Sequence, residues 1–519
     1  MRIHQKKIIF GIVFMTLLLN KAVYADIPQP SAWSNLFNKK KNTANLFNIL
    51  VEEQKQKEIK DTKQTNPKVV QVLNQTSLPK IQKERSQLGT INCLSQTKLD
   101  QEHVLELMFA IEKAVCHHPE ANNAWIQTKI QAAQVGISKA SYYPQVNTTI
   151  NYDWGKDNYQ VNNREDLSYD TNTRRYGIAV QANWLLYDFG ARQHQVAASE
   201  KLLAMSFAQQ NTVLQDIILK TIMAYYAVIQ VELKLDNLQQ LVVLAEQNYD
   251  IAHARYKAGA GIKSDELQML ANLSKAKADQ IKFIGDLKIA KGNLAALMGE
   301  PAYQDFKINS QLKIPNVLNL KSIQDLIAES IQLNPKFKAA QLAIDAATEK
   351  VKSVKKSNYP ALSLITNYNN SEQMGESPFA NNTQRIQAGV QLSIPLFDGF
   401  NQKNQVILAN ETVKLKQSEQ DLLKQEVSTE IWKNYNELQA VHENIKALSV
   451  LNQSAEEAYV VAQGRYKAGV GNMLEMINAQ NLLVEAKMNY ATSVTNFLVV
   501  RYQLLANIGN LNVWADEPI

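Results

Sequence analysis

Four segments of the chain alternate between apolar and polar side chains. They cover residues 145–154, 176–184, 362–368 and 386–394. Alternation with a period of two is typical of a β-strand that has one apolar and one polar face. Such strands occur both in outer-membrane barrels and in half-buried soluble sheets. We favour a barrel, because the sequence between the segments offers no second layer that could cover the apolar face of a soluble sheet.

Long helical segments separate the strand pairs. Residues 190–258 and 400–468 each predict one long helix, and low counts of 18 glycines and 13 prolines fit such lengths. A helix of about 25 residues is expected before each strand pair, and one of about 37 residues after each long helix. At 1.5 Å per residue the long helix measures about 100 Å, and the two shorter ones end to end about 93 Å. One long helix can therefore lie beside two short ones.

Apolar and small residues recur at steps of three and four inside these helices. One such seam consists of Leu235, Leu238, Val242, Ala245, Tyr249, Ala252 and Tyr256. A second seam consists of Ile477, Asn481, Val484, Met488, Ala491, Thr495 and Leu498. This spacing is typical of a coiled coil, and the small residues suit close packing of helices. We therefore interpret both stripes as structural core.

The chain is an internal duplication. The motif Arg-Tyr-Lys-Ala-Gly occurs at Arg255–Gly259 and again, 210 residues later, at Arg465–Gly469. Upstream of the strands the offset is 216 residues, as the match of Tyr143-Pro144 with Tyr359-Pro360 shows. The difference of six residues falls in 156–174 and 371–384, which contain Asn, Asp, Ser and Gly and predict hairpin loops. Two tandem repeats, 99–305 and 306–519, follow from these offsets.

The N-terminal region differs in kind from the repeats. Residues 1–25 combine early lysines with a short apolar run and small residues, which predicts a signal peptide cleaved after Ala25. No later apolar stretch is expected to form a transmembrane helix, which needs about 20 residues. Residues 26–98 contain 12 basic and 6 acidic residues. We expect them to form a polar, basic and largely disordered extension.

Four strands cannot close a barrel, and open strand edges cannot lie in lipid. Several copies of the chain must then combine their strands into one barrel. Three copies supply twelve strands, enough to enclose a polar lumen. The predicted fold is therefore mainly α with a membrane β-barrel section, in a homotrimer whose long antiparallel helices pack as coiled coils.

Charge and motif content exclude several classes of function. Residues 99–519 contain 39 basic and 43 acidic residues, which gives no reason to expect nucleic-acid binding. We predict no catalytic residue, metal site or cofactor: His117 and His118 lack metal-ligand spacing, and the glycines near Gly259 do not follow a strand. A non-transporting trimeric coiled-coil surface protein is the alternative of another class. The strand pairs inserted between the helical rods argue against it.

The two cysteines are Cys93 and Cys116. An even number in an exported chain predicts a disulfide, which would stabilise the fold by about 3 kcal/mol in the chain-entropy model. The alternative is two unpaired thiols. Thiol labelling without reductant distinguishes the two.

The strand-flanked motifs "LLYDFG" and "IPLFDGF", the two "RYKAG" turns and the helix lengths resemble the TolC family of outer-membrane factors over residues 99–510. The resemblance implies a trimer with a twelve-stranded barrel in outer-membrane lipid and a helical tunnel in the periplasm. It also implies a periplasmic adaptor and an inner-membrane transporter, either an ABC pump or a proton-driven one. Residues 93–120 resemble members that serve type I secretion of RTX-like proteins. The expected function is type I protein export, with multidrug efflux as the alternative.

The resemblance also implies roles for residues at the helix turns. The family's periplasmic tip, where the adaptor docks, maps onto Arg255, Tyr256, Gly259, Arg465, Tyr466 and Gly469. A plain helix C-cap explains the same residue types. The family's gate maps onto Glu475, which constricts the tunnel, and Asp265, which holds the tip closed. Asn478 and Gly471 replace a second acid and an arginine of the family pattern, and an exposed helical carboxylate is the alternative for Glu475.

Overall fold

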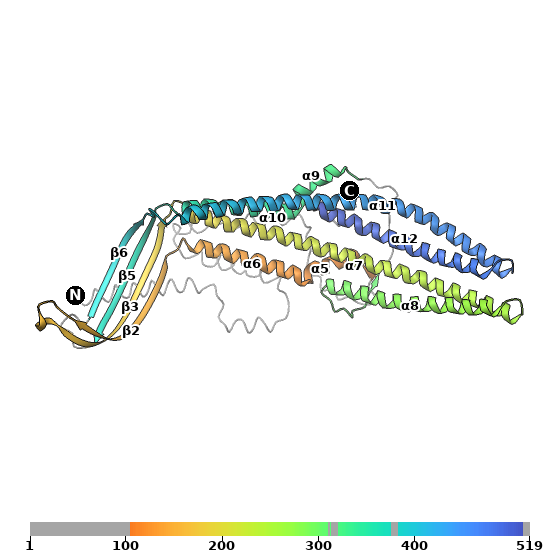
Figure 1. Cartoon of the computed structure of the whole chain (residues 1–519), viewed down its shortest axis with the longest axis horizontal. Coiled ribbons are helices and arrows are strands. Elements are labelled where there is room, and N and C mark those ends of the chain that lie inside the picture. Colours follow the sequence, from red (N-terminus) through yellow and green to blue (C-terminus); the bar gives the residue numbers. More distant parts are fainter. Residues whose placement is uncertain (1–103, 310–311, 313–319, 375–381, 512–519) are drawn as a thin grey trace, which may run out of the picture. The chain divides into compact units, whose positions relative to one another are not determined.

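The computed structural model describes residues 104–309, 312, 320–374 and 382–511. All of them belong to one compact unit, Ser95–Ile519, whose elements Figure 1 labels and colours along the sequence. The expected signal peptide, the basic extension 26–98 and Cys93 lie outside the described residues. They stay predictions.

One four-stranded antiparallel sheet stands at one end of the helices (Figure 1). It contains β2 (Gln145–Tyr159), β3 (Tyr169–Tyr187), β5 (Ala361–Met374) and β6 (Asn382–Ser393), in the order β2-β3-β5-β6. All four predicted strands are thus confirmed. Within the described part of the chain, no strand pairs with the outer edges of β2 and β6.

The first hairpin loop is shorter than we expected. Residues 156–174 were interpreted as loop, but the ladder continues from Lys156, opposite Asn172, to Tyr159, opposite Tyr169. Only a short 3₁₀ turn at Glu165–Leu167 and its flanks connect the strands. The prediction was wrong because the sequence of these strand ends lacks the apolar alternation on which the strand assignment rested.

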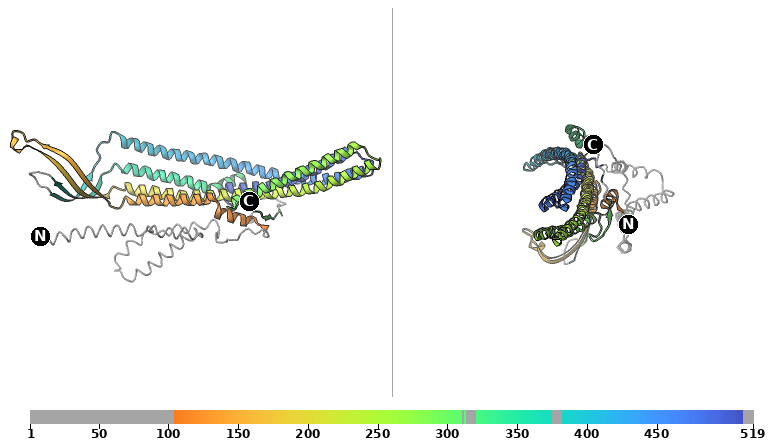
Figure 2. Two further views of the ribbon diagram at one scale, coloured as in Figure 1. Left: turned by 90° about the horizontal axis from the view of Figure 1, so that it is seen from below. Right: turned by 90° about the vertical axis from the view of Figure 1, so that its right-hand side faces the viewer.

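The helices follow the predicted pattern in both repeats. The long helices are α7 (Ala191–Lys257) and α11 (Asn401–Lys467), with 67 residues each. The helices before the strands, α6 (Pro119–Ala140) and α10 (Pro335–Lys356), have 22 residues. The returning helices, α8 (Lys263–Leu297) and α12 (Met473–Ile508), have 35 and 36. Figure 2 shows that, seen along their length, these helices form one curved layer rather than a closed bundle.

Small elements near the middle of the long helices were not predicted. They are β1 (Val104–Leu105), which pairs in parallel with β4 (Lys307–Ile308), and the helices α5 (Leu107–His117) and α9 (Ile323–Leu333). A proline at the first position of α6 and of α10 marks where each new helix begins. The side chains of His118 and Asn334 accept hydrogen bonds from the backbone there.

The first predicted seam is confirmed except at Tyr256, which is 41% exposed, and the second is wrong in its first half. In α7 the side chains of Leu235, Leu238, Ala245 and Ala252 are buried. In α12 the buried stripe is Met476, Gln480 and Leu483, one position before the predicted one. The reason is that α12 packs against both α11 and α7, which turns its buried face.

The sheet carries an exposed apolar face. The side chains of Ile150, Tyr152 and Trp154 on β2 are 75%, 68% and 76% exposed, and every residue of β6 is exposed. A soluble sheet would bury such a face. One stretch of α7 is also apolar and long enough to span a membrane by composition, contrary to our expectation. Ile217, Ile222 and other buried residues of α7 show that its apolar positions serve helix packing.

Candidate functional site: the paired helix turns

The two long helices end in the same turn, which the duplicated motif builds. In the first repeat the N–H of Gly259 donates to the carbonyl of Tyr256, at 3.0 Å, and the N–H of Ala260 to that of Arg255, at 2.9 Å. Gly259 has φ +70° and Gly469 has φ +78°, the left-handed conformation that reverses the chain. Both glycines have open space where a Cβ would lie, or only a distant side-chain atom. Backbone conformation, and not space, therefore requires glycine there.

Gly471 explains one departure from the family pattern. A Cβ at this position would lie 2.9 Å from the Cβ of Arg465 and 3.1 Å from its carbonyl carbon. An arginine cannot take this place unless the turn shifts. The close packing of the backbone at this turn therefore leaves no room for the arginine of the family pattern.

Arg255 ties the turn of the first repeat to that of the second. One of its amino groups donates a hydrogen bond to the backbone carbonyl of Tyr466, and the other donates to Ala260 O at 3.3 Å. The guanidinium lies over the Tyr466 ring, 4.7 Å from its centre. Tyr466 is only 2% exposed, so this cation–π contact is shielded from water and stronger than an exposed one.

Asp265 completes the cluster at Tyr466. Burial raises the pKa of the Tyr466 hydroxyl, and the negative charge of Asp265 raises that pKa further. Arg255 and Asp265 come from the first repeat and Tyr466 from the second. The structure thus brings together three of the eight residues predicted for the tip and the gate.

Tyr256 and Arg465 are equivalent to Tyr466 and Arg255 in the other repeat, but they lie open. Tyr256 is 41% exposed and has the Lys263 ammonium 4.8 Å from its ring centre. The Arg465 side chain is 53% exposed, and the one ion pair that it forms with another described residue is a loose one with Glu475, at 3.7 Å. Within the described residues, one half of the motif is engaged and the other half is exposed.

Glu475 and Asp265 occupy the same position, the third residue of the returning helices α12 and α8. The N–H of Glu475 donates to the side chain of Asn472 at 2.8 Å, which caps the helix. An acidic residue in the first helical turn is favoured by the helix dipole. The gate role of Glu475 stays a prediction, since the geometry of one protomer fits an exposed carboxylate equally well.

A buried polar network above the turns was missed in the sequence. Asn248 of α7 is fully buried and donates to Gln480 of α12, at 2.9 Å, and to the Tyr459 hydroxyl of α11, at 3.1 Å. Gln463 of α11 donates to Asn248 Oδ1 at 3.0 Å and to the Tyr459 hydroxyl at 2.9 Å. The network joins the two helical hairpins, because its members would be left unsatisfied if the hairpins parted.

The first hairpin carries a charged cluster close to its turn. Glu266 is buried and accepts from Lys263, and its other oxygen lies 2.7 Å from His253 Nδ1. Lys263 first, and then His253, lower the pKa of the Glu266 carboxyl. Gln463 and Met476 stand at the positions of His253 and Glu266 in the second hairpin. Ion pairs therefore connect the two helices near the turn of the first hairpin, whereas the second hairpin has uncharged residues at the positions of His253 and Glu266.

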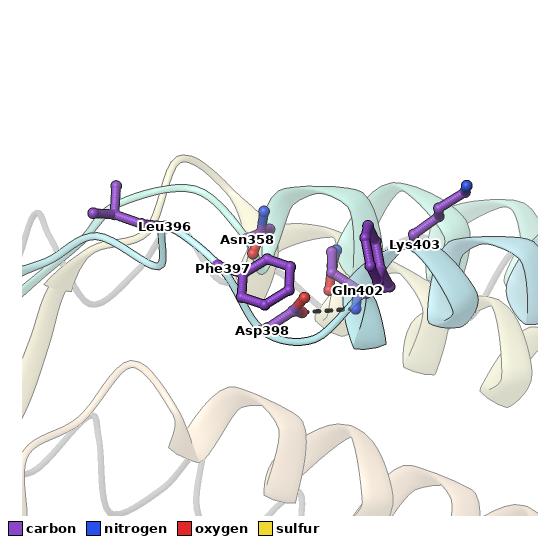
Figure 3. A pocket seen from close by; sticks show the side chains of 7 residues that line it. Asn358, Leu396, Phe397, Asp398, Gln402 and Lys403 are labelled. Atoms are coloured by element: carbon purple, nitrogen blue, oxygen red, sulfur yellow. Dashed lines mark hydrogen bonds between the residues drawn. The ribbon is translucent and has the colours of Figure 1, made fainter.

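The strand-to-helix elbows also differ. In the first repeat Arg192 fills the elbow: it donates to the carbonyl of Leu185 at 2.7 Å and stacks 4.6 Å from the ring centre of Tyr142. In the second repeat a pocket stays open beside Phe397 and Phe400, which are 76% and 63% exposed (Figure 3).

Only one of the two cysteines of the predicted disulfide lies within the described residues. Cys116 is disulfide-bonded, and its expected partner, Cys93, lies outside the described residues. The pairing therefore stays a prediction. Within 104–309, 320–374 and 382–511, no group of three His, Cys, Asp or Glu residues is placed to hold a metal ion.

Comparison with known proteins agrees with this architecture. The protein CyaE of Bordetella pertussis is 26% identical over 408 residues, which cover 78% of this chain and 84% of that protein. The alkaline protease secretion protein AprF of Pseudomonas aeruginosa is 22% identical and covers 72% of this chain and 80% of its own. The solved structure of the outer-membrane channel OprN shares the fold, with a TM-score of 0.66 at 16% identity over 81% of this chain and 95% of that one.

The family match repeats the internal duplication. Residues 110–300 and residues 326–510 each match the family described as outer membrane efflux protein. These two ranges correspond to the two repeats and leave out the connection between them. The location is accordingly the outer membrane, with the helices on the periplasmic side. The chain belongs to the outer membrane efflux protein family.

Proposed function

We propose that three copies of this chain form one channel that exports proteins across the outer membrane. The sheet carries this proposal: it has four strands, an apolar exposed face, and outer edges on β2 and β6 to which no described strand is paired. Lipid does not tolerate such edges, and three sheets of four strands close into a barrel. The curved layer of helices in Figure 2 has the form expected of one section of a tunnel wall.

Type I secretion is the favoured cargo pathway. The name of AprF states that it serves the secretion of alkaline protease, and residues 93–120 resemble members that export RTX-like proteins. A periplasmic adaptor and an inner-membrane ABC transporter would then supply the energy and the cargo. Multidrug efflux through a proton-driven pump is the second candidate, favoured by the description of the family.

We place adaptor docking and gating at the turns. The glycine turns with Arg255, Tyr256, Arg465 and Tyr466 form the end of each hairpin that is farthest from the sheet (Figure 1). Exposed backbone and basic side chains suit a protein partner there. The contact of Arg255 and Asp265 with Tyr466 holds the two hairpins of one protomer together, and its release would let the tip widen.

Deletion of the gene separates the candidates. Under type I secretion, loss of the protein abolishes release of the RTX-like cargo into the medium and leaves drug susceptibility unchanged. Under multidrug efflux, susceptibility rises and secretion continues. If the purified protein forms no ion-conducting pore in a planar bilayer, the protein is a non-transporting surface protein and both transport functions are excluded.

A further inference from the structure

The two repeats of one protomer contact each other in the sheet and in the helices. We call this contact the internal joint. In the sheet, Tyr187 of β3 lies opposite Leu362 of β5. In the helices, Lys201 Nζ of α7 lies 3.3 Å from Asp345 Oδ2 of α10. One side of this joint is therefore β3 with α7, and the other side is β5 with α10.

The duplication assigns an equivalent to each side. The elements equivalent to β3 and α7, 210 residues later in the chain, are β6 and α11. The elements equivalent to β5 and α10, 216 residues earlier, are β2 and α6. Those elements form the two outer faces of the protomer. A second copy that repeats the internal joint would thus bring α11 and β6 of one protomer against α6 and β2 of the next.

The charges on the two outer faces are complementary in this arrangement. Lys201 corresponds to Glu411 on α11, and Asp345 corresponds to Lys129 on α6. Both signs are reversed, so that the attraction is retained between protomers. Both residues are exposed in one protomer, and the Glu411 ion pair within its own helix, with Lys414, is a surface one.

The sizes of the residues at the elbow are complementary as well. In the internal joint Gly190 faces the long side chain of Lys356, whose Nζ would lie 3.2 Å from a Cβ at residue 190. The equivalent pair is Phe400, the residue before α11, and Ala140 at the end of α6. The large side chain lies on the α10 side of the internal joint but on the α11 side of the outer one, and the small residue faces it in both. Phe400 is 63% exposed in the protomer. The open elbow in Figure 3 is thus a place for the next copy.

At the tip, the residues equivalent to Arg255 and Tyr466 are Arg465 and Tyr256. In the outer joint these two residues would belong to two different copies of the chain. We propose that Arg465 of each protomer stacks on Tyr256 of the next protomer and closes the tip between protomers. This inference rests on the proposed trimer. Both side chains are half exposed, with 53% for the Arg465 side chain and 41% for Tyr256, whereas the internal Tyr466 is 2% exposed.

The tip joint between protomers lacks the buried polar network of the internal joint. Asn248 and Gln480, which hydrogen-bond in the internal joint, correspond to Ala458 and Leu270 in the outer one. Ala458 and Leu270 cannot repeat that hydrogen bond. The ring of six hairpins therefore alternates between a strong joint inside each protomer and a weaker one between protomers, and it parts at the weaker joint.

Cysteine cross-linking tests the pairing directly. In a background with Cys93 and Cys116 replaced by alanine, the pair Arg465→Cys and Tyr256→Cys is treated with a short bifunctional maleimide in detergent. One cysteine per protomer allows covalent dimers at most, whereas the pair allows a covalent trimer on a denaturing gel. We expect the covalent trimer from the pair and not from either single variant.

The outcomes separate this proposal from the proposed function. If the pair stays uncross-linked while light scattering shows a trimer, the Arg465–Tyr256 contact is wrong and the trimeric channel stands. If light scattering shows a monomer for the unmodified protein, the trimer itself is wrong and the contact with it.

A conductance measurement covers the case in which the cysteine pair fails to assemble. Tyr256→Leu removes the ring face, whereas Tyr256→Phe keeps it. We expect Tyr256→Leu to raise the open probability in a planar bilayer by about fivefold and Tyr256→Phe to leave it unchanged. Equal openings of Tyr256→Leu and Tyr256→Phe would overturn the stack.

Discussion

The two helical hairpins share a motif but differ in what holds it. In the first hairpin the ion cluster of His253, Lys263 and Glu266 closes the end of the helices, while Met476 of the second hairpin is fully buried among apolar side chains. Tyr466 is enclosed and Tyr256 is open. Duplication has thus preserved the turn and let the contacts around it diverge. The difference indicates that the turn serves both hairpins alike, whereas closure of the tip is divided between unequal joints.

The largest effect is expected from changes in the glycine turn, which both hairpins share. Replacement of both Gly259 and Gly469 by valine forces a β-branched residue to positive φ, at a cost of about 1–3 kcal/mol at each turn. We expect export to fall by more than about tenfold as the turns change shape and adaptor docking weakens. Secreted cargo is measured in the medium, and light scattering must still show the trimer. Unchanged export in the double variant would refute the assignment of the tip.

The next effect concerns the enclosed contact of the two hairpins. Arg255→Gln removes the cation over Tyr466, and we expect a higher open probability because a shielded cation–π contact contributes about 2 kcal/mol. Tyr466→Phe keeps the ring and is the matched control, with a smaller change. Single-channel recording at one salt concentration compares the two. A closed channel in Arg255→Gln would show that this contact does not hold the tip.

Acid should affect the two hairpins unequally. Lys263 and His253 lower the Glu266 pKa below its ordinary value of 4.5. A carboxyl with a lowered folded-state pKa stabilises the fold above its unfolded-state pKa, and this contribution is lost as the pH falls through the folded-state value. We therefore expect the amide protection of the ends of α7 and α8 to drop below about pH 4.5, measured as hydrogen-exchange protection factors. The ends of α11 and α12 are the internal control, and Glu266→Gln should abolish the difference.

The smallest effects are expected at the two acids in the first turns of the returning helices. Three copies of Glu475 around the axis would favour cations, so that Glu475→Gln should lower cation selectivity with little change in assembly. Asp265→Asn should instead raise conductance, because the charge beside Tyr466 is lost. Reversal potentials across a salt gradient decide the first point. If Glu475→Gln keeps the selectivity, the carboxylate is only a solvated residue of the first helical turn.

The sequence predicted the features that repeat and missed those that depend on one contact. Periodicity located all four strands and six main helices, because burial of a face imposes the spacing of residues. It did not predict the polar ribbon at Lys156–Tyr159 or the small elements α5 and α9, whose formation depends on neighbours distant in sequence. At the candidate site, the motif identified Arg255 and Tyr466. Their stacking and the buried Asn248 network depend on tertiary contacts between the two repeats, which no local sequence pattern indicates.

The central claim is that the unpaired edges of the sheet are completed by two further copies of the chain. Light scattering of the detergent-extracted protein, corrected for bound detergent, measures this directly. We predict a protein mass of three protomers. A stable monomer that still conducts ions would contradict the claim, because one protomer would then close a barrel without partners for β2 and β6.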